Sequence, residues 1–447
     1  MKNRREFISS GAALAVATAG NCAFAMVPSE QAAWDRYNAS EQGRSEGVLG
    51  SAPFLQVPAP DSMGVAFAVN ELANGFAEVA DNPDMNGAVC HMAEGLPQAG
   101  VDDRVLQVRI TGLKPATKYW YRVGAAGFTN PVGYWKRRKT IEWSPLYSFT
   151  TPGEMATSRF AVINDTHEKW DAFKLVTDKL AELAVPVIVW NGDLMSSLAR
   201  TREDIVRAVL KPCVGEGFAA SLPVLLNRGN HDFRGEASIH LERVMMTRLP
   251  TERNVRDWAL TRNFAYRQGD IALIGLDTGE DKPDCHPAHG GIARFEAYRT
   301  AQTAWLRDQF RRREISGAPY IVAFAHIPIF DSRPNANPGT ILEDWADWQK
   351  QCADEWGPIL SANGVQLVVA GHTHCFRCDP PDGKRTWAQI VGGGPDIDNI
   401  DPGRFPTVIE GRVEGGMLKL VVHDVVHRNV AGAFDFAPRV AWPIDKS

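Results

Sequence analysis

The chain has 447 residues, of which 44% are hydrophobic and 23% are charged. This length accommodates two or three domains with sizeable cores, and the composition excludes a largely disordered or mostly membrane-embedded chain. The formal net charge of −5 argues against a general nucleic-acid binder, because such proteins carry a basic footprint.

The first 25 residues are typical of an export signal read by the twin-arginine translocation machinery. Arg4 and Arg5 precede an Ala-rich apolar stretch, and residues 23–25 (AFA) offer a small-residue cleavage site. The apolar stretch is shorter than the roughly 20 residues that a membrane span needs. Cleavage would shift the net charge from −5 to −7, since three basic residues and one acidic residue are lost. We therefore expect a periplasmic or extracellular protein with no stable membrane span.

The next part of the chain predicts a linker followed by a β-sandwich. Residues 26–57 carry scattered Ser, Gly, Glu and Gln and are expected to form a linker or arm. Over residues 58–152, short segments of alternating apolar and polar residues are separated by Gly, Pro and Asn. Period-two alternation with frequent turn residues predicts an all-β sandwich of roughly 100 residues.

From residue 158 to about residue 430 the pattern is that of an α/β domain. The apolar segments RFAVIN, PVIVWN, LPVLLN, YIVAFA and VQLVVA predict buried strands, and amphipathic segments with helical spacing separate several of them. Such strands occur in sheets that helices cover. Strands without helices return after residue 385, and residues 431–447 are expected to form a C-terminal tail.

Polar side chains follow each of the five predicted strands. In chain order these are Asp165 and His167, Asp193, Asn230 and His231, His326, and His372 and His374. Each motif alone is more often a turn, a cap or a satisfied core polar group. Together they indicate a metal site, because the carboxyl ends of strands in open α/β sheets meet at one crevice. Carboxylate, amide and imidazole groups are ligands for divalent metals.

The order D-x-H, G-D, G-N-H-D, H and G-H-T-H resembles that of the calcineurin-like metallophosphoesterases over residues 158–425. The resemblance implies a four-layer α/β/β/α domain with two metal ions. It implies that one ion binds Asp165, His167 and His374, the other binds Asn230, His326 and His372, and Asp193 bridges the two. It also implies that His231 lies beside the metals without binding them. We expect His231 to assist the leaving group and Asp232 to hold its ring.

The sandwich resembles a fibronectin type III module, on the segments VRITGLKPATKYWYRVG and SPLYSFTTP. A module of this kind directly before a phosphoesterase domain is similar to the purple acid phosphatases. Those enzymes carry G-D-x-G and G-D-x-x-Y, whereas this chain has NDTH and places Ser196 at the tyrosine position. His167 can replace the missing tyrosinate as a ligand. The resemblance thus implies two transition metals drawn from Fe, Mn or Zn, and it leaves a ferric, purple site in doubt.

Three further residues are candidates for contact with the substrate: His286, His289 and Arg333. The two histidines belong to a loop that could overhang the metals, although an ordinary solvated loop is an equal alternative. Arg333 could clamp a phosphate. Cys375 and Cys378 have C-x-x-C spacing without a second pair, which favours a local disulfide or two free thiols over a zinc site.

These features predict an exported dinuclear-metal phosphoesterase that hydrolyses small phosphomonoesters by attack of a metal-bridging hydroxide. One alternative is a phosphodiesterase acting on cyclic nucleotides or lipid headgroups. An alternative of another class is a catalytically inert surface binding module.

Overall fold

The computed structural model describes residues 47–93, 100–129, 136–196, 199–246, 262–289, 291–330, 345–398 and 401–439. The expected export signal lies outside these ranges. The chain divides into two compact units, and one of them, residues 1–45 with 129–136, lies almost wholly outside the described residues. The account below concerns the other unit. Among the described residues, no helix combines the length and apolar character that crossing a lipid bilayer requires.

The largest sheet has nine strands in the order β22-β21-β20-β11-β12-β13-β1-β2-β6. Their bounds are β1 (Phe54–Ala59), β2 (Ser62–Ala68), β6 (Val105–Thr111), β11 (Arg159–Ile163), β12 (Ile188–Asn191), β13 (Val224–Asn227), β20 (Thr407–Glu414), β21 (Met417–Asp424) and β22 (Asn429–Phe436). Strand β22 thus extends into the segment predicted as a tail, and β1 begins within the segment predicted as a linker. Strands β11, β12 and β13 are parallel.

A second sheet of six strands has the order β14-β15-β16-β17-β19-β18. Its strands are β14 (Phe264–Gln268), β15 (Ile271–Leu276), β16 (Tyr320–Ala325), β17 (Leu367–Ala370), β18 (Arg377–Asp379) and β19 (Ala388–Val391). Strands β15, β16 and β17 are parallel and buried along their whole length, which explains their continuous apolar sequence.

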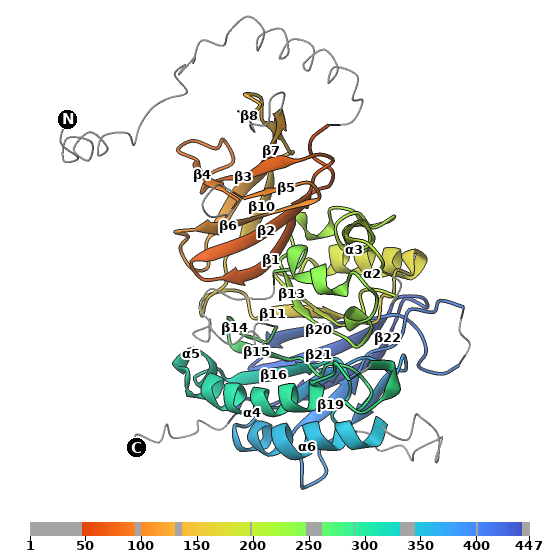
Figure 1. The fold of residues 1–447 in the computed structure, drawn as a ribbon. Helices are drawn as coiled ribbons and strands as arrows, with labels where there is room; N and C mark the ends of the chain where they lie inside the picture. Colours follow the sequence, from red (N-terminus) through yellow and green to blue (C-terminus); the bar gives the residue numbers. More distant parts are fainter. Residues whose placement is uncertain are drawn as a thin grey trace, which may run out of the picture. The chain divides into compact units, whose positions relative to one another are not determined.

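The two sheets face each other across a core, and helices cover their outer faces (Figure 1). Phe160 of β11 meets Phe324 of β16 with ring centroids 6.0 Å apart. Helices α2 (Trp170–Leu183) and α3 (Arg202–Val209) pack on the nine-stranded sheet. Helices α4 (Phe295–Arg311) and α6 (Trp345–Ala362) pack on the six-stranded sheet, and α5 (Arg313–Ser316) follows α4. The predicted four-layer α/β/β/α arrangement is confirmed.

The predicted N-terminal sandwich is also confirmed. Its second sheet contains β3 (Ala73–Ala80), β4 (Val89–Met92), β5 (Val101–Asp102), β7 (Lys118–Thr129), β8 (Lys136–Arg137), β9 (Glu142–Trp143) and β10 (Tyr147–Thr150). An apolar core that includes Phe67 and Tyr121 lies between this sheet and strands β1, β2 and β6. The sandwich is continuous with the α/β part, because β1 pairs in parallel with β13 at Gln56 and Val224.

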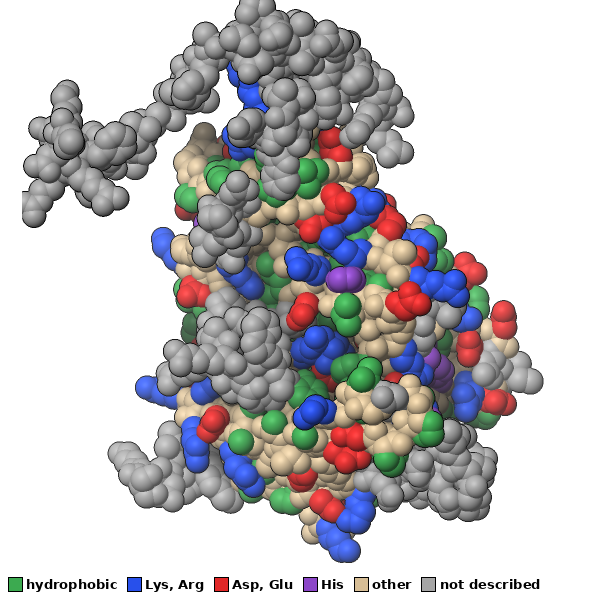
Figure 2. All heavy atoms as spheres, viewed as in Figure 1, with side chains coloured by type: hydrophobic (Ala, Val, Ile, Leu, Met, Phe, Trp, Pro, Cys, Tyr) green, Lys and Arg blue, Asp and Glu red, His purple; other side chains and the backbone are tan. Residues whose placement is uncertain are grey.

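Charged side chains of both signs are interspersed on the face drawn in Figure 2. This distribution agrees with the modest net charge of −5.

Candidate metal centre

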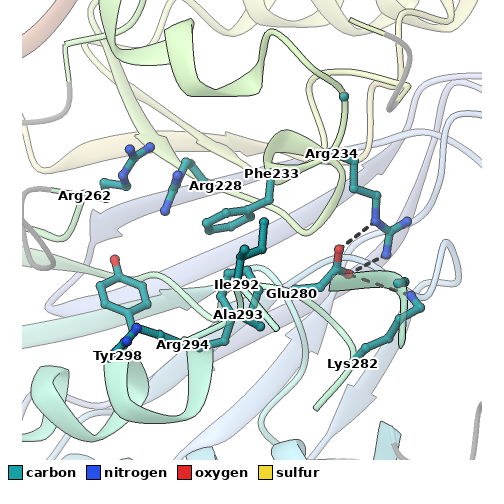
Figure 3. Close-up of a pocket in the computed structure, with 13 residues that line it drawn as sticks. Arg228, Phe233, Arg234, Arg262, Glu280, Lys282, Ile292, Ala293, Arg294 and Tyr298 are labelled. Atoms are coloured by element: carbon teal, nitrogen blue, oxygen red, sulfur yellow. Dashed lines mark hydrogen bonds and ion pairs between the residues drawn. The ribbon is translucent and has the colours of Figure 1, made fainter. Parts of the chain in front are cut away.

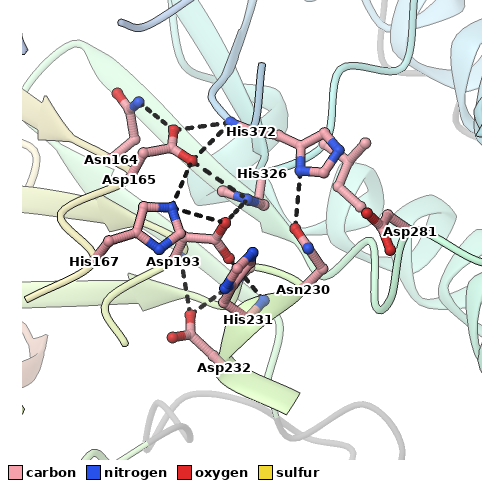
Figure 4. A network of polar contacts seen from close by, with 12 residues as sticks. Asn164, Asp165, His167, Asp193, Asn230, His231, Asp232, Asp281, His326 and His372 are labelled. Atoms are coloured by element: carbon pink, nitrogen blue, oxygen red, sulfur yellow. Dashed lines mark hydrogen bonds and ion pairs between the residues drawn. The ribbon is translucent and has the colours of Figure 1, made fainter. Parts of the chain in front are cut away.

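The strand ends of both sheets position the candidate centre. Asp165 and His167 follow β11, Asp193 follows β12, and Asn230 follows β13. His326 follows β16 in the second sheet, while His372 and His374 follow β17. Because the strands that carry these residues run parallel to one another within each sheet, their carboxyl ends lie at the same edge. All seven predicted ligands therefore meet in one place, and Figure 4 labels all of them except His374.

The first group of potential ligands consists of Asp165, His167, Asp193 and His374, whose ligand atoms lie within 4.8 Å of one another. The Nε2 atoms of His167 and His374 are 3.0 Å apart. The His374 Nε2 atom is 3.3 Å from Asp165 Oδ1. Three of these residues are buried, while the His374 side chain is 29% exposed, so the group is open on one side.

The second group consists of Asp193, His326 and His372. His326 Nε2 lies 3.2 Å from Asp193 Oδ2, and Asn230 Oδ1 lies 2.9 Å from His372 Nδ1. Asp193 belongs to both groups. A carboxylate shared in this way is what two neighbouring cations require, since they repel each other unless an anion lies between them.

The hydrogen bonds of two histidines direct their free nitrogens into the centre. His167 Nδ1 lies 3.2 Å from the carbonyl oxygen of Met195, and His326 Nδ1 lies 2.7 Å from that of Asn191. A carbonyl oxygen only accepts, so each Nδ1 carries a proton, and in the neutral ring Nε2 presents its lone pair to the centre. His326 Nε2 is buried and has no hydrogen-bond partner among the described residues. These donors fit a bound cation.

The pKa values of His326 and Asp193 also indicate that the centre stabilises a positive charge. Burial favours a neutral His326, but the carboxylates of Asp193 and Asp165 outweigh it and raise the pKa of His326 to about 10. Burial alone would raise the pKa of Asp193, yet the charge on His326 lowers it to about 2. The negative charges of Asp165 and Asp193 thus favour a protonated His326, and a bound metal ion would neutralise the same charges.

Several ligands have backbone conformations that side chains rarely adopt. The φ angles are +49° at Asp165, +45° at His167, +52° at Asp193, +68° at His372 and +52° at His374. Each left-handed residue other than glycine costs about 1–3 kcal/mol, and such strain concentrates at functional sites. The tight turns allow two side chains of the same segment, two residues apart, to point into the centre.

Glycines next to the ligands make this packing possible. A Cβ atom at Gly229 would overlap the carboxylate and backbone nitrogen of Asp193. A Cβ atom at Gly192, where φ is +88°, would overlap the ring of His326. The glycines of the G-D and G-N-H-D motifs therefore serve close approach between two strand ends.

Asp232 holds a loop rather than the His231 ring, so that expectation is wrong. Its carboxylate accepts backbone N–H groups from Gly229 (2.9 Å), Asp193 (3.0 Å), Leu194 (3.0 Å) and Met195 (3.3 Å). Burial and the charge of Asp193 raise the pKa of Asp232 to about 6. Asp232 thus fixes the turn that presents Asp193.

His231 lies beside the first ligand group. Its ring centroid is 4.6 Å from that of His167, and it begins the short 3₁₀ helix η2 (His231–Phe233). Arg234 Nη1 donates to His231 Nε2 at 3.2 Å. Since arginine only donates, the proton of the neutral ring is on Nδ1. Burial lowers the pKa of His231 to about 4, although Asp193 opposes this shift.

The remaining predicted residues lie apart from the two ligand groups or outside the description. His286 is buried in the loop after β15, where its Nδ1 accepts the backbone N–H of Ala288 at 3.1 Å. The side chain of His289 and the whole of Arg333 lie outside the described residues. Ser196 donates to Glu168 Oε2 at 2.7 Å.

Cys375 and Cys378 are free thiols, so the alternative of a local disulfide is not realised.

Sequence reasoning missed three residues around the ligands. Asn164 donates to Asp165 Oδ2 at 2.6 Å, and Asp281 accepts from Arg234 Nη2 at 2.8 Å. Figure 4 places Asp281 beside His372. Asn164 and Arg234 directly adjoin the predicted motifs, which was a usable signal. Asp281 belongs to the loop that was expected to be able to overhang the metals, but no motif singled out this residue within it.

Comparison with known proteins agrees with this geometry. Residues 158–376 match the family model described as calcineurin-like phosphoesterase, and residues 52–151 match that of the purple acid phosphatase N-terminal domain. The α/β part of the chain is therefore similar to the calcineurin-like phosphoesterases, and the N-terminal part is similar to the N-terminal domain of purple acid phosphatases. The chain is a purple acid phosphatase-like metallophosphoesterase with a candidate dinuclear metal site.

Two curated relatives come from Arabidopsis thaliana. The probable purple acid phosphatase 20 is 23% identical over 279 residues, which are 61% of this chain and 55% of the relative. Purple acid phosphatase 18 is 22% identical over 269 residues, or 59% and 50% of the two chains. The matches thus span about half the length of each relative. The purple acid phosphatase PPD1 from yellow lupin seeds shares the fold, with a TM-score of 0.59, 14% identity, and coverage of 87% of this chain and 75% of that chain.

Proposed function

We propose that the protein is an exported, metal-dependent hydrolase of small phosphomonoesters. The observation that carries this proposal is the pair of ligand groups that share Asp193. Names of the matched relatives and the sandwich before the α/β domain support phosphomonoesters over the alternatives. Export rests on the N-terminal sequence alone.

In this proposal the side chains of the chain would hold two metal ions in fixed positions. Asp165, His167 and His374 would hold one metal ion, and Asn230, His326 and His372 the other, with Asp193 between them. When bound, two such cations supply an activated water and neutralise the charge of a phosphoryl group. The metals could be Fe, Mn or Zn.

Neutral and buried groups prepare the centre for an anionic substrate. Asn230 is 1% exposed and adds a ligand oxygen without adding negative charge. The N–H of His231 can donate to a phosphoryl or leaving-group oxygen, and a bound anion would raise the pKa of His231 from its low value of about 4. Arg234 keeps the ring oriented through its 3.2 Å contact.

The test compares a monoester with its diester. Metal-loaded protein should hydrolyse para-nitrophenyl phosphate faster than bis(para-nitrophenyl) phosphate, and a chelator should abolish both reactions. His231→Ala should keep its metals and lose roughly 10²–10⁴-fold in turnover. Faster hydrolysis of the diester would favour the phosphodiesterase alternative. If neither ester were cleaved by metal-loaded protein, the inert binding module would replace the enzyme.

A further inference from the structure

A second feature of the α/β domain is a pocket of about 700 Å³ (Figure 3), whose lining residue Arg234 contacts His231 beside the candidate metal centre. The loop after β13, the loop after β15 and the start of α4 contribute its walls. Its volume lies within the range of roughly 300–1,000 Å³ that small-molecule sites occupy. The metal ligands described above are not among its lining residues.

Arg234 forms a wall that the pocket and the centre share. It lines the pocket, and its Nη1 atom contacts the ring of His231. The guanidinium is fixed by Glu280, at 2.5 and 2.8 Å, and by Asp281, at 2.8 Å. A substrate whose phosphoryl group lies at the metals would therefore have its leaving group near this wall.

The pocket is lined by five cationic side chains. They are Arg228, Arg234, Arg262, Lys282 and Arg294, and the lining includes one carboxylate, that of Glu280. Acids already bind three of these cations. Arg228 donates twice to Asp277, at 2.7 and 2.9 Å, while Glu280 and Asp281 accept from Arg234, and Asp281 accepts from Lys282.

Arg262 and Arg294 can still bind an anionic group of a ligand. Arg262 lies 3.6 Å from Glu242, and its buried Nη1 has no hydrogen-bond partner among the described residues. Burial and the neighbouring charge of Arg228 lower the pKa of Arg262, so an anion there would relieve both effects. Arg294 is exposed, and within the described ranges no ion pair involves it.

Apolar side chains also line the pocket. Phe233 stacks under Arg228, with the guanidinium carbon 3.7 Å from the ring centroid, and meets Phe295 edge-on at 5.1 Å. Ile292 is 86% exposed at the rim. A large exposed aliphatic side chain next to aromatic rings suits the apolar part of a ligand.

We propose that this pocket binds the leaving group of the substrate, and that this group combines an apolar ring with a second anionic group held by Arg262 and Arg294. The proposal rests on the proposed function, because the metal centre is what positions the scissile phosphoester. It narrows the substrate class to phosphoesters that carry two separated negative groups.

The experiment compares phenyl phosphate with para-carboxyphenyl phosphate. Metal-loaded wild type should favour the carboxylated ester in kcat/KM by about tenfold, the usual effect of one charge-assisted hydrogen bond. Arg262→Gln and Arg294→Gln should each lower this preference towards one. Arg294 is exposed, so its variant tests the pocket even if Arg262→Gln folds poorly. Arg311→Gln, at the far end of α4 with a 77% exposed side chain, should keep the preference.

A binding measurement separates the two proposals. Calorimetry with phenylphosphonate and para-carboxyphenylphosphonate needs no turnover. If phenyl phosphate is not cleaved, the proposed function fails, while tighter binding of the carboxylated phosphonate still supports the pocket. Equal binding of the two phosphonates, or a preference that both arginine variants retain, would overturn the pocket assignment alone.

Discussion

Asp232 illustrates how a buried acid can organise a metal centre without being a ligand. Its carboxylate accepts four backbone N–H groups, three of which belong to the turn at Asp193. Those bonds help to hold Asp193 at a φ of +52°. The residue types of the centre could be predicted because they follow apolar strands directly. The backbone groups that Asp232 binds could not be predicted, since they depend on how two loops fold against each other.

Replacement of Asp232 by asparagine should weaken the whole centre. The amide offers one acceptor oxygen instead of two, so backbone donors lose their partners and the free energy of unfolding should fall by about 1–3 kcal/mol. Metal affinity should fall roughly 10–100-fold. Thermal or denaturant unfolding and metal titration measure both effects. Asp178→Asn, which breaks an exposed pair with Lys174, should change stability by at most about 0.5 kcal/mol. Unchanged stability and affinity in Asp232→Asn would contradict this role.

At the scale of elements, β11 and β1 are the two strands that join the central parallel part of the large sheet to its antiparallel parts. Strand β11 pairs in parallel with β12 and antiparallel with β20. Across the β11–β20 pair, Arg159 donates to Glu410 at 2.6 and 2.8 Å. The buried strands were predictable from their apolar runs. The pairing of β1 with β13 was not, because strand partners are set by long-range packing that a local pattern does not encode.

The ion pair at Glu410 should make stability depend on acidity. The ring of His423, with Nε2 3.6 Å from Glu410 Oε2, and the hydrogen bond from Arg159 lower the pKa of Glu410 from 4.5 to about 2. A lowered pKa stabilises the fold above the unfolded value and loses that effect as the pH falls towards 2. Glu410→Gln should thus be less stable than wild type by about 3 kcal/mol at most near neutral pH.

The difference in unfolding free energy between Glu410→Gln and wild type should shrink between pH 4.5 and about 2. Chemical denaturation at a series of pH values measures it. Glu414→Gln, in which the replaced side chain is 60% exposed and pairs with Arg412, should show little pH-dependent difference. A constant difference for Glu410→Gln across this range would refute the assignment.

At the scale of the described unit, the sandwich and the α/β domain share one nine-stranded sheet. Further contacts join them: Tyr121 of β7 donates to the carbonyl of Ala220 at 2.7 Å, and Phe54 of β1 meets Phe218 edge-on at 5.6 Å. The alternation of apolar and polar residues predicted the sandwich, and the apolar runs separated by amphipathic segments predicted the α/β part. Their continuity was not predicted, because the segment that contains β1 has the composition of a linker.

The shared sheet should make both parts unfold together. Hydrogen exchange of peptides from β7 and β16, followed against denaturant, should give coincident midpoints. Tyr121→Phe removes one hydrogen bond between the parts and should lower both midpoints equally, by about 1 kcal/mol in unfolding free energy. Loss of protection in β7 at a clearly lower denaturant concentration than in β16 would show two independent domains.

The metal content of the folded chain tests the central claim most directly. Elemental analysis of purified, metal-loaded wild type should give about two transition-metal ions per chain. Asp193→Asn should reduce this content while Asp178→Asn leaves it unchanged, because only Asp193 belongs to both ligand groups. A folded wild-type protein that binds one ion or none, or an Asp193→Asn variant that retains both, would contradict a centre built around a shared carboxylate.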